Sequence, residues 1–477
     1  VVTTFPPLNT SQLQYAYTRA PFELVLPLKL PPLGALTVLV VPQTPRNRGY
    51  VADNVHSPVV SLENSSNQAN QKDLVIANEY LKLEFDASSC LLKRMTNLEA
   101  QLSAVVSQNF HWYRSADWTD GKQASGAYIF RPNTTAVHPV TDPGATVACQ
   151  VVKTPLVQEL RQYYSNWTSQ TIRVYAKQQH AELEWTIGPI PTAFSNQDQV
   201  GREVIMRFET DINSQDLFYT DANGRQILRR KRNFQETYPY HNAEPAAGNY
   251  YPVNSRIFIS DNRRQLTLLT DRSHGGSSLA NGQMELMLHR RMYEDDHFGV
   301  GEALDEPGVD GRGLVVRGRT WLLLSSPNAA PSLHRPLALQ LFHRPVISVG
   351  RLPKWAQRNP TRAFHQRKNI FSGLKYELPP NVHLLSLELT AANVAIVRLE
   401  HIYARVEDVN LSKPAVVNLN DLFSSLELTS VTELLLAGDR VKESVDNNPS
   451  APLNGTVTLQ PFDIRTFRCV INKRKTT

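Results

Sequence analysis

Cysteine is scarce in this 477-residue sequence, which contains only Cys90, Cys149 and Cys469. Three cysteines are too few for a disulfide-dense scaffold, and their spacing does not match a structural zinc site. The odd count leaves two alternatives open for the third cysteine, a bridge to a partner chain or a buried free thiol. The pairing itself is left open.

Long hydrophobic runs are also missing, because no stretch approaches the roughly 18 apolar residues of a transmembrane helix. The longest candidate, Ala35 to Val41, has the length of a strand. With 41% hydrophobic residues, however, the chain can bury a core, which excludes a wholly disordered protein. We therefore expect a folded chain with no membrane partner.

Neither sign of charge dominates the sequence. Lysine and arginine total 50 against 44 aspartates and glutamates, for a net charge of +6. Short basic clusters occur at 229–232 and 473–475, without the concentrated basic face that nucleic-acid binders usually carry. We expect these clusters to be solvated or ion-paired, and we predict no nucleic-acid partner.

Motifs for metal binding and for serine nucleophiles are absent as well. The sequence has no HExxH, no histidine is followed two positions later by aspartate, and His289 adjoins Arg290 and Arg291. The glycine-rich run at 275–278 is not GxSxG and reads as a tight loop. We therefore expect no metal site in this chain.

Period-2 alternation of apolar residues is what the sequence has in abundance, and it predicts an all-β protein. The clearest alternating segments are Leu74 to Phe85, Ala181 to Ile187, Gln265 to Thr270, Leu314 to Leu324, Val394 to Val406 and Thr456 to Ile471. Turn pairs lie between or before them at Asn223-Gly224, Asp261-Asn262, Asn281-Gly282 and Asp310-Gly311. The 31 scattered prolines argue against long helices. The run Thr429 to Val441 is a candidate short helix that could equally be a strand.

Polar linkers at about 54–72 and 345–372 divide the chain into three predicted domains. These are a small N-terminal β-sandwich domain (1–72), a central domain (73–345) and a C-terminal β-sandwich (346–477). The central block exceeds a simple sandwich, so we expect a large two-sheet assembly there.

Carboxylate pairs and aromatic clusters are the candidates for chemistry. Glu182 and Glu184 share one face of a predicted strand, and Asp295 and Asp296 are adjacent in a predicted loop. A glycosidase needs two carboxyls about 5–9 Å apart, but each pair taken alone fits a solvated or salt-bridged role better. Aromatic residues near 111–118, 219 and 250–251 suit either sugar stacking or core packing.

Sequons of the form Asn-x-Ser/Thr permit a secretory origin. They occur at Asn9, Asn64, Asn133, Asn166, Asn410 and Asn454, which we predict as glycosylation sites. The sequence starts with Val1 and no signal-like segment follows, so we expect a recombinant product or a processed piece of a longer chain.

Several ordered segments closely resemble the C-terminal half of lysosomal-type α-mannosidases of glycoside hydrolase family 38, including the vacuolar plant enzymes. They are SGAYIFRPN (Ser125 to Asn133), VKTPLVQEL (Val152 to Leu160), ELEWTIGPIP (Glu182 to Pro191), FYTDANGRQI (Phe218 to Ile227), AGNYYPVNSRIFI (Ala247 to Ile259), LTLLTDRSHGGSSL (Leu266 to Leu279), MELMLHRRMYEDD (Met284 to Asp296) and VNLNDLFSSLEL (Val417 to Leu428). The resemblance implies a small β domain, a central β-supersandwich like that of sugar mutarotases, and a terminal β-sandwich.

The resemblance also implies an activity that is shared between two chains. Family members are retaining exo-mannosidases that act on terminal α-mannose of N-glycans, with one zinc ion and a carboxylate nucleophile on an N-terminal domain. That domain is missing here, so we expect a separate large N-terminal catalytic chain to bind the zinc, and no catalytic or metal-binding residue in this chain. The expected assembly is a vacuolar or lysosomal hetero-oligomer of two-chain protomers, whose dimerisation is left open.

Three residues of this chain are implied to line the substrate site. Tyr128 matches the family tyrosine that hydrogen-bonds the substrate, and Asp296 belongs to the family's loop after HRR. Phe298 replaces the arginine that usually follows in that loop, so it is expected either to stack on a sugar or to pack. The alternatives to an enzyme subunit are a non-catalytic scaffold and a carbohydrate-binding β module.

Overall fold

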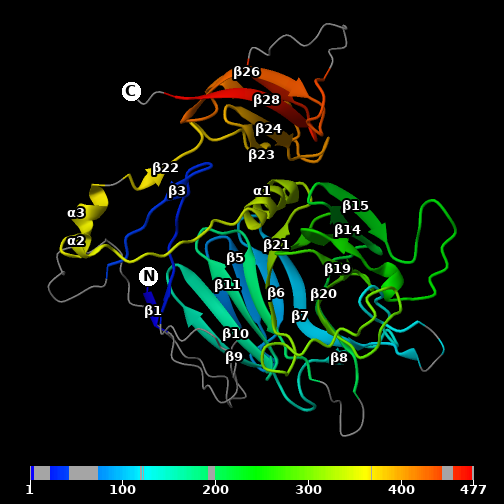
Figure 1. The fold of residues 1–477 in the computed structure, drawn as a ribbon. Coiled ribbons are helices and arrows are strands. Elements are labelled where there is room, and N and C mark those ends of the chain that lie inside the picture. Colours follow the sequence, from blue (N-terminus) through cyan, green and yellow to red (C-terminus); the bar gives the residue numbers. More distant parts are fainter. Residues whose placement is uncertain are drawn as a thin grey trace. The chain divides into compact units, whose positions relative to one another are not determined.

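The structure, a computed structural model, describes residues 2–4, 22–41, 73–118, 121, 123–191, 199–366, 368–442 and 455–474. The chain folds into two compact units (Figure 1). The first contains residues 54–330 with 336–342 and the N-terminal 26 residues, and the second contains 27–53, 331–335 and 343–477. In the described part of the chain, no helix is long and apolar enough to cross a membrane.

Two nine-stranded antiparallel sheets form the first unit (Figure 1). One sheet has the strand order β15-β14-β17-β18-β21-β12-β11-β10-β9, and the other has β16-β19-β20-β13-β7-β6-β5-β4, with β8 paired to β7. The strands are β4 (Leu74–Ala77), β5 (Leu81–Phe85), β6 (Leu92–Asn97), β7 (Leu102–Arg114), β8 (His138–Pro139), β9 (Ala148–Lys153), β10 (Val157–Ser165), β11 (Thr168–Tyr175), β12 (Ala181–Ile187), β13 (Arg202–Thr210), β14 (Leu217–Ala222), β15 (Gln226–Lys231), β16 (Tyr251–Val253), β17 (Arg256–Ser260), β18 (Gln265–Thr270), β19 (His274–Ser277), β20 (Gln283–Arg291) and β21 (Val316–Ser325). A separate pair joins β1 (Val2–Thr4) to β2 (Phe22–Leu24).

The core of the first unit receives side chains from both of these sheets. Leu83 and Phe110 from one sheet and Ile172 and Leu183 from the other belong to one buried apolar cluster. The burial pattern of β5 alternates between buried and partly buried residues, as the period-2 sequence predicted. Burying each such Leu or Phe stabilises the fold by about 1.5–3 kcal/mol. The predicted large two-sheet assembly is confirmed.

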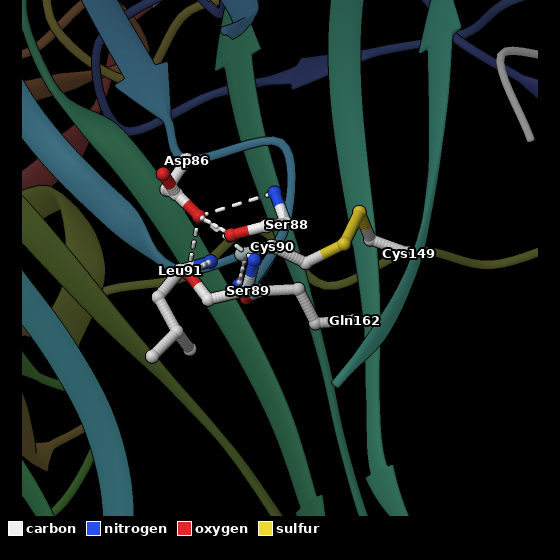
Figure 2. Close-up of a disulfide and its surroundings, with 7 residues drawn as sticks. All are labelled: Asp86, Ser88, Ser89, Cys90, Leu91, Cys149 and Gln162. Carbon is white, nitrogen blue, oxygen red and sulfur yellow. Dashed lines mark hydrogen bonds between the residues drawn. A yellow bond between two sulfur atoms is a disulfide. The ribbon is translucent and has the colours of Figure 1, made fainter. Parts of the chain in front are cut away.

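One disulfide, Cys90–Cys149, links the two sheets (Figure 2). Cys90 ends the turn between β5 and β6, and Cys149 lies on β9. The Asp86 carboxylate accepts hydrogen bonds from the Ser88 hydroxyl (2.6 Å) and the Ser89 backbone N–H (2.8 Å), which closes this turn. These bonds, with that from the Ser88 hydroxyl foremost, lower the pKa of Asp86 to about 2.

The third cysteine, Cys469, is free and fully buried. Burial raises the pKa of its thiol to about 12. Of the two alternatives left open by the sequence, the structure shows the buried free thiol.

The second unit is a smaller β-sandwich. Its four-stranded sheet has the order β23-β24-β28-β26, and two-stranded pairs join β25 to β27 and β22 to β3. These strands are β3 (Ala35–Leu36), β22 (Ile370–Phe371), β23 (Val382–Ala391), β24 (Val394–His401), β25 (Ala415–Asn418), β26 (Leu426–Leu434), β27 (Thr456–Leu459) and β28 (Ile464–Lys473). Val397 and Phe467 of the larger sheet share a buried cluster with Val417 and Leu459 of β25 and β27.

Helices are few and short in the described residues. They are α1 (Ala330–Phe342), α2 (Lys354–Gln357) and α3 (Pro360–His365), with 3₁₀ turns η3 (Ala247–Asn249) and η4 (Leu419–Asp421). The expectation from proline content, that long helices are absent, holds for the described residues, where the longest helix is α1 with 13 residues, although it contains Pro336. The second half of α1 is rich in Leu and Ala, and their high helix propensity offsets the backbone hydrogen bond that Pro336 cannot donate. The candidate helix Thr429 to Val441 instead begins within strand β26.

The all-β class is confirmed, whereas the three-domain division stays a prediction. Much of residues 1–72, including the linker predicted at 54–72, lies outside the described residues. Residues 27–53 belong to the second unit.

Candidate functional site

A tight loop between β7 and β8 presents the tyrosine that the sequence singled out. Its backbone turns where Gly126 N–H donates to the Ile129 carbonyl at 2.9 Å. Tyr128 lies at the tip and is 65% exposed. We call residues 125–130 the tyrosine loop. The phenol of Tyr128 is exposed to solvent, while hydrogen bonds hold the backbone of the loop in place.

The Asp296 carboxylate holds the tyrosine loop by hydrogen bonds. Asp296 lies in the loop that follows β20. Oδ2 accepts hydrogen bonds from the backbone N–H groups of Tyr128 (2.6 Å) and Ile129 (2.9 Å), and Oδ1 accepts one from Phe298 (3.2 Å). The Asp296 residue is fully buried. One carboxylate thus joins the two loops that carry Tyr128 and Phe298.

The approach of the two loops leaves no room for a side chain at position 126. A Cβ added to Gly126 would lie 2.5 Å from Asp296 Cβ, 2.6 Å from Cγ and 2.7 Å from its backbone nitrogen. Real Cβ atoms do not approach other atoms so closely, so any larger residue must push the loops apart. Glycine is required here by close approach.

A second polar layer, Ser125, Glu203 and Arg290, supports the loop from the sheet. Glu203 on β13 and Arg290 on β20 face each other in the strand register, and Arg290 Nε donates to Glu203 Oε2 at 2.8 Å. The Ser125 hydroxyl donates to Glu203 Oε1 at 2.7 Å, while Arg290 Nη2 donates to the Ile129 carbonyl at 2.7 Å. Glu203 and Ser125 are fully buried. Regular strands therefore fix the base of the tyrosine loop.

The electrostatics of Asp296 favour its ionised form. Burial raises the pKa of the Asp296 carboxyl, but the backbone donors of Ile129, Tyr128 and Phe298, with the charge of Arg290, outweigh burial and lower the pKa below its ordinary value. The carboxylate therefore remains a hydrogen-bond acceptor in moderately acidic solution.

Beneath the loop, Phe130 packs on the buried Tyr113 and the half-buried Tyr250. Its ring centroid lies 4.6 Å from Tyr250 and 5.8 Å from Tyr113. Both phenols donate to Glu285 Oε1, at 2.5 and 2.9 Å, and Arg207 Nε donates to Oε2 at 2.8 Å. Burial raises the pKa of Tyr250 well above its ordinary value, so the phenol remains a donor. These aromatics near 113 and 250 serve packing, one of the two alternatives considered for them.

The structure brings the three predicted site residues together. Phe298 is 60% exposed, so within this chain it does not pack, and Tyr128 is exposed beside it on the joined loops. Nearby, Trp118 stacks on His297 with ring centroids 4.8 Å apart. Asp296 has its carboxylate oxygens directed to backbone donors, so these contacts give it the task of positioning Tyr128. Substrate binding by all three residues stays a prediction.

Metal binding has no support from the described part of the chain, where no group of three or more His, Cys, Asp or Glu side chains could hold an ion. Two of the histidines, His111 and His180, are partly buried. Burial lowers the pKa of His111 and of His180 to about 4. The described residues therefore do not fit the family's zinc ion.

The carboxylate pair Glu182/Glu184 is salt-bridged, as the alternative to catalysis anticipated. Arg173 Nη1 lies 2.9 Å from Glu184 and 3.4 Å from Glu182, and Arg319 Nη2 lies 2.9 Å from Glu184. In the basic cluster on β15, Arg230 lies over the Tyr251 ring at 4.2 Å.

Three of the predicted glycosylation sites can be located. Asn133, Asn166 and Asn410 are exposed, whereas Asn9, Asn64 and Asn454 lie outside the described residues. Glycan attachment at all six sites stays a prediction.

Sequence reasoning missed the residues that hold the site. Ser125 and Gly126 adjoin Tyr128 in the SGAY motif, and a small residue beside a loop glycine is a signal for close backbone approach. Glu203 lies 78 residues away from Ser125 and gave no local signal. Arg290 was noted in the sequence only as a cationic neighbour of His289.

Comparison with known proteins gives consistent matches along the chain. Residues 76–298 match the glycosyl hydrolases family 38 C-terminal domain, and residues 381–467 match the family 38 C-terminal beta sandwich domain. Lysosomal alpha-mannosidase of Bos taurus is 44% identical over 86% of this chain and 42% of its own length. Lysosomal alpha-mannosidase of Homo sapiens is 42% identical over 94% of this chain and 44% of its length.

A plant relative and a solved structure extend these matches. Alpha-mannosidase of Canavalia ensiformis is 35% identical over 81% of this chain and 41% of its length. The crystal structure of an alpha-mannosidase from Enterococcus faecalis shares the fold with a TM-score of 0.53 at 13% identity, over 83% of this chain and 42% of that one. The chain spans less than half the length of these relatives. It belongs to glycosyl hydrolase family 38 and corresponds to the family's C-terminal domains.

Proposed function

We propose that this chain is the β-rich part of a retaining, zinc-dependent exo-α-mannosidase that removes terminal α-mannose from N-glycans in the lysosome or vacuole. The nucleophilic carboxylate and the zinc ligands belong to a large N-terminal chain. Support comes from relatives named as lysosomal alpha-mannosidases, of which this chain spans only 42–44%. The described residues contain no group of three or more His, Cys, Asp or Glu side chains that could hold a metal ion, and we assign the zinc ligands to the large chain.

The observation that carries the proposal is the tethered tyrosine loop. An exposed phenol on a loop that a buried carboxylate and an arginine–glutamate pair hold in place is preorganised to meet a ligand. In the assembled enzyme, the Tyr128 hydroxyl donates a hydrogen bond to a mannose hydroxyl and Phe298 stacks on a C–H face of the glycan.

In this proposal the reaction proceeds by two displacements at the anomeric carbon. A carboxylate of the large chain attacks the anomeric carbon and displaces the rest of the glycan, whose leaving oxygen takes a proton from an acid of the large chain. Water, which gives up a proton to the same group, then displaces the carboxylate and releases the mannose. The task of this chain is to orient the mannose so that attack occurs in line, which is how positioning residues lower a barrier. Asp296 acts through Tyr128 and Phe298.

Native mass spectrometry of purified material tests the assembly. We expect a second polypeptide and one zinc ion per protomer, and hydrolysis of a synthetic α-mannoside only when both chains are present. Full activity of the 477-residue chain alone would refute the two-chain proposal. Tight binding of α-mannosides by the isolated chain without hydrolysis would favour a carbohydrate-binding module, and normal activity after substitution of Tyr128 would favour a scaffold.

A further inference from the structure

An apolar segment of the second unit, residues 27–41, remains uncovered. Nine of its fifteen residues are Ala, Val or Leu, yet none of the fifteen is buried. Six large apolar side chains are 41–62% exposed, namely Leu28, Leu30, Leu33, Val38, Val40 and Val41. Burial of such side chains is the main driving force of folding, so a stretch of this composition left open is the mark of an interface.

Backbone hydrogen bonds attach the segment to its unit between Pro32 and Thr37, and an ion pair attaches Lys29 to Glu377. Ala35 and Leu36 (β3) pair with Phe371 and Ile370 (β22), and Thr37 N–H donates to the Asn369 carbonyl at 2.8 Å, as the adjacent ribbons in Figure 1 show. We call residues 27–41 with β22 the β3–β22 arm. Ile370 and Phe371 are themselves 59% and 43% exposed. A two-stranded ribbon with both partners exposed is marginally stable by itself and gains from a further strand or an apolar cover.

The chemistry of the arm selects an apolar occupant. Lys29 is the single charged residue among residues 27–41, and it forms an ion pair with Glu377 at 3.0 Å. Thr37 is the single residue of the segment with a side-chain hydroxyl. A glycan needs several hydrogen-bonding partners and an anionic ligand needs cations, and the arm supplies neither. A protein surface that contributes apolar side chains or a sheet edge fits it.

We propose that the β3–β22 arm is the docking surface for the large N-terminal chain, which covers it with an apolar strand or sheet face. This inference rests on the proposed function, which requires such a chain. More than half of each matched relative lies outside the region that this chain spans, so enough polypeptide exists to cover the arm. Addition of a strand to an open sheet edge is a recurrent mode of protein association.

A matched pair of valines makes the test specific. Val40 in the arm is 62% exposed, and Val416 on β25 of the same unit is 58% exposed. This chain is co-expressed with the remainder of its precursor as wild type, Val40→Asp, Leu30→Asp/Val40→Asp and Val416→Asp, and association is measured by analytical ultracentrifugation. Loss of one to two buried side chains should weaken association about 10- to 100-fold for the arm variants, and less than about two-fold for Val416→Asp.

Each outcome supports or overturns the inference. Hydrogen exchange of wild-type protein should show that amides 28–41 are slower in the complex than in the isolated chain. Unchanged association of the arm variants with a companion chain present overturns the docking surface and leaves the proposed function standing. Failure of any companion chain to associate with the wild type refutes both. Dimerisation of the chain alone that the arm variants abolish assigns the surface to a second copy and overturns the inference.

Discussion

Two carboxylate networks in the first unit differ in the groups that they position. In the tyrosine-loop network, Asp296 accepts from the backbone of a loop, and Glu203 accepts from Ser125 and Arg290. In the strand network, Arg173 lies 2.7 Å from Glu159 on β10 and 2.9 Å from Glu184 on β12, all within one sheet. The first network ends at an exposed phenol, and the second ends inside a sheet.

The difference shows why carboxylate content alone does not locate a site. Both networks satisfy buried charge with nearby donors, as burial requires. A strand network adds to stability but presents no group to a ligand. In a network that fixes a loop, the buried hydrogen bonds hold the loop backbone and thereby position its exposed side chain. Substitutions in the first should therefore change activity, and substitutions in the second should change stability.

Gly126→Ala should give the largest effect. Its Cβ would lie 2.5 Å from Asp296 Cβ, so the tyrosine loop must move by a distance on the order of 1 Å. Such a displacement should lower kcat/KM of the assembled enzyme by at least about 100-fold. Steady-state kinetics with a synthetic α-mannoside measure it.

The matched control is Gly350→Ala, because a Cβ there meets nothing within 4 Å and its φ is not positive. It should leave kcat/KM within about two-fold. Equal losses in the two variants would show that the close approach at Gly126 does not position the loop.

Tyr128→Phe should lower turnover by about 10- to 100-fold, as removal of one hydrogen bond made in the transition state does. The thermal midpoint should not change, because the residue is 65% exposed and the substitution removes a single hydroxyl. A loss confined to kcat identifies a transition-state contact. Kinetics equal to wild type would remove Tyr128 from the site.

Asp296→Asn should have a smaller effect, about 10-fold in kcat/KM, because the amide oxygen can still accept one of the backbone N–H groups. The pKa of Asp296 is lowered in the folded state, so the stabilisation by its ionised form is complete above the ordinary value of 3.8 and is lost as pH falls through the lowered pKa. The ratio of wild-type kcat/KM to that of Asp296→Asn should be constant from pH 7 to about 4, and it should fall as pH passes through the lowered pKa of Asp296.

The exposed loop residue Asp310 provides the control for this pH dependence. Its carboxylate pairs with Arg312 at 2.7 Å, outside the tyrosine-loop network. Asp310→Asn should match wild type at every pH where circular dichroism shows folded protein. A ratio of wild type to Asp296→Asn that varies between pH 5 and 7 would contradict the assignment.

Local patterns predicted the strands well and the site only in part. The segments Ala181 to Ile187 and Gln265 to Thr270 coincide with β12 and β18. Buried and partly buried residues alternate in the second half of β12, whereas all six residues of β18 are buried, so both faces of β18 are covered. Leu74 to Phe85 instead forms two strands, since Asn78 Oδ1 accepts from Tyr80 and Leu81 N–H in a turn that interrupts the alternation. A side-chain turn of this kind changes the chain direction without changing the apolar pattern.

The site depended on contacts distant in sequence. Tyr128 and Asp296 are 168 residues apart, and their hydrogen bond exists only because β7 and β20 flank β13 in one sheet. The resemblance to the family predicted Tyr128 and Asp296 as site residues. The requirement for Gly126 and the support from Glu203 depend on how closely the loops and strands approach one another in the folded chain. Neither could be read from periodicity or composition.

Glu184→Gln, in the strand network, should have the smallest effect on activity and should instead lower stability. Arg173 and Arg319 lower the pKa of Glu184 although burial raises it, so the ionised pair stabilises the sheet above the ordinary value of 4.5. The half-exposed position limits the loss to about 1 kcal/mol, or roughly 2–4 °C in Tm at pH 7, with kcat/KM unchanged. The difference in Tm between wild type and variant should shrink as pH falls below 4.5 through the lowered pKa, because the carboxylate no longer contributes once it is protonated. A loss of activity without a change in Tm would place Glu184 in the chemistry and erase the distinction between the two networks.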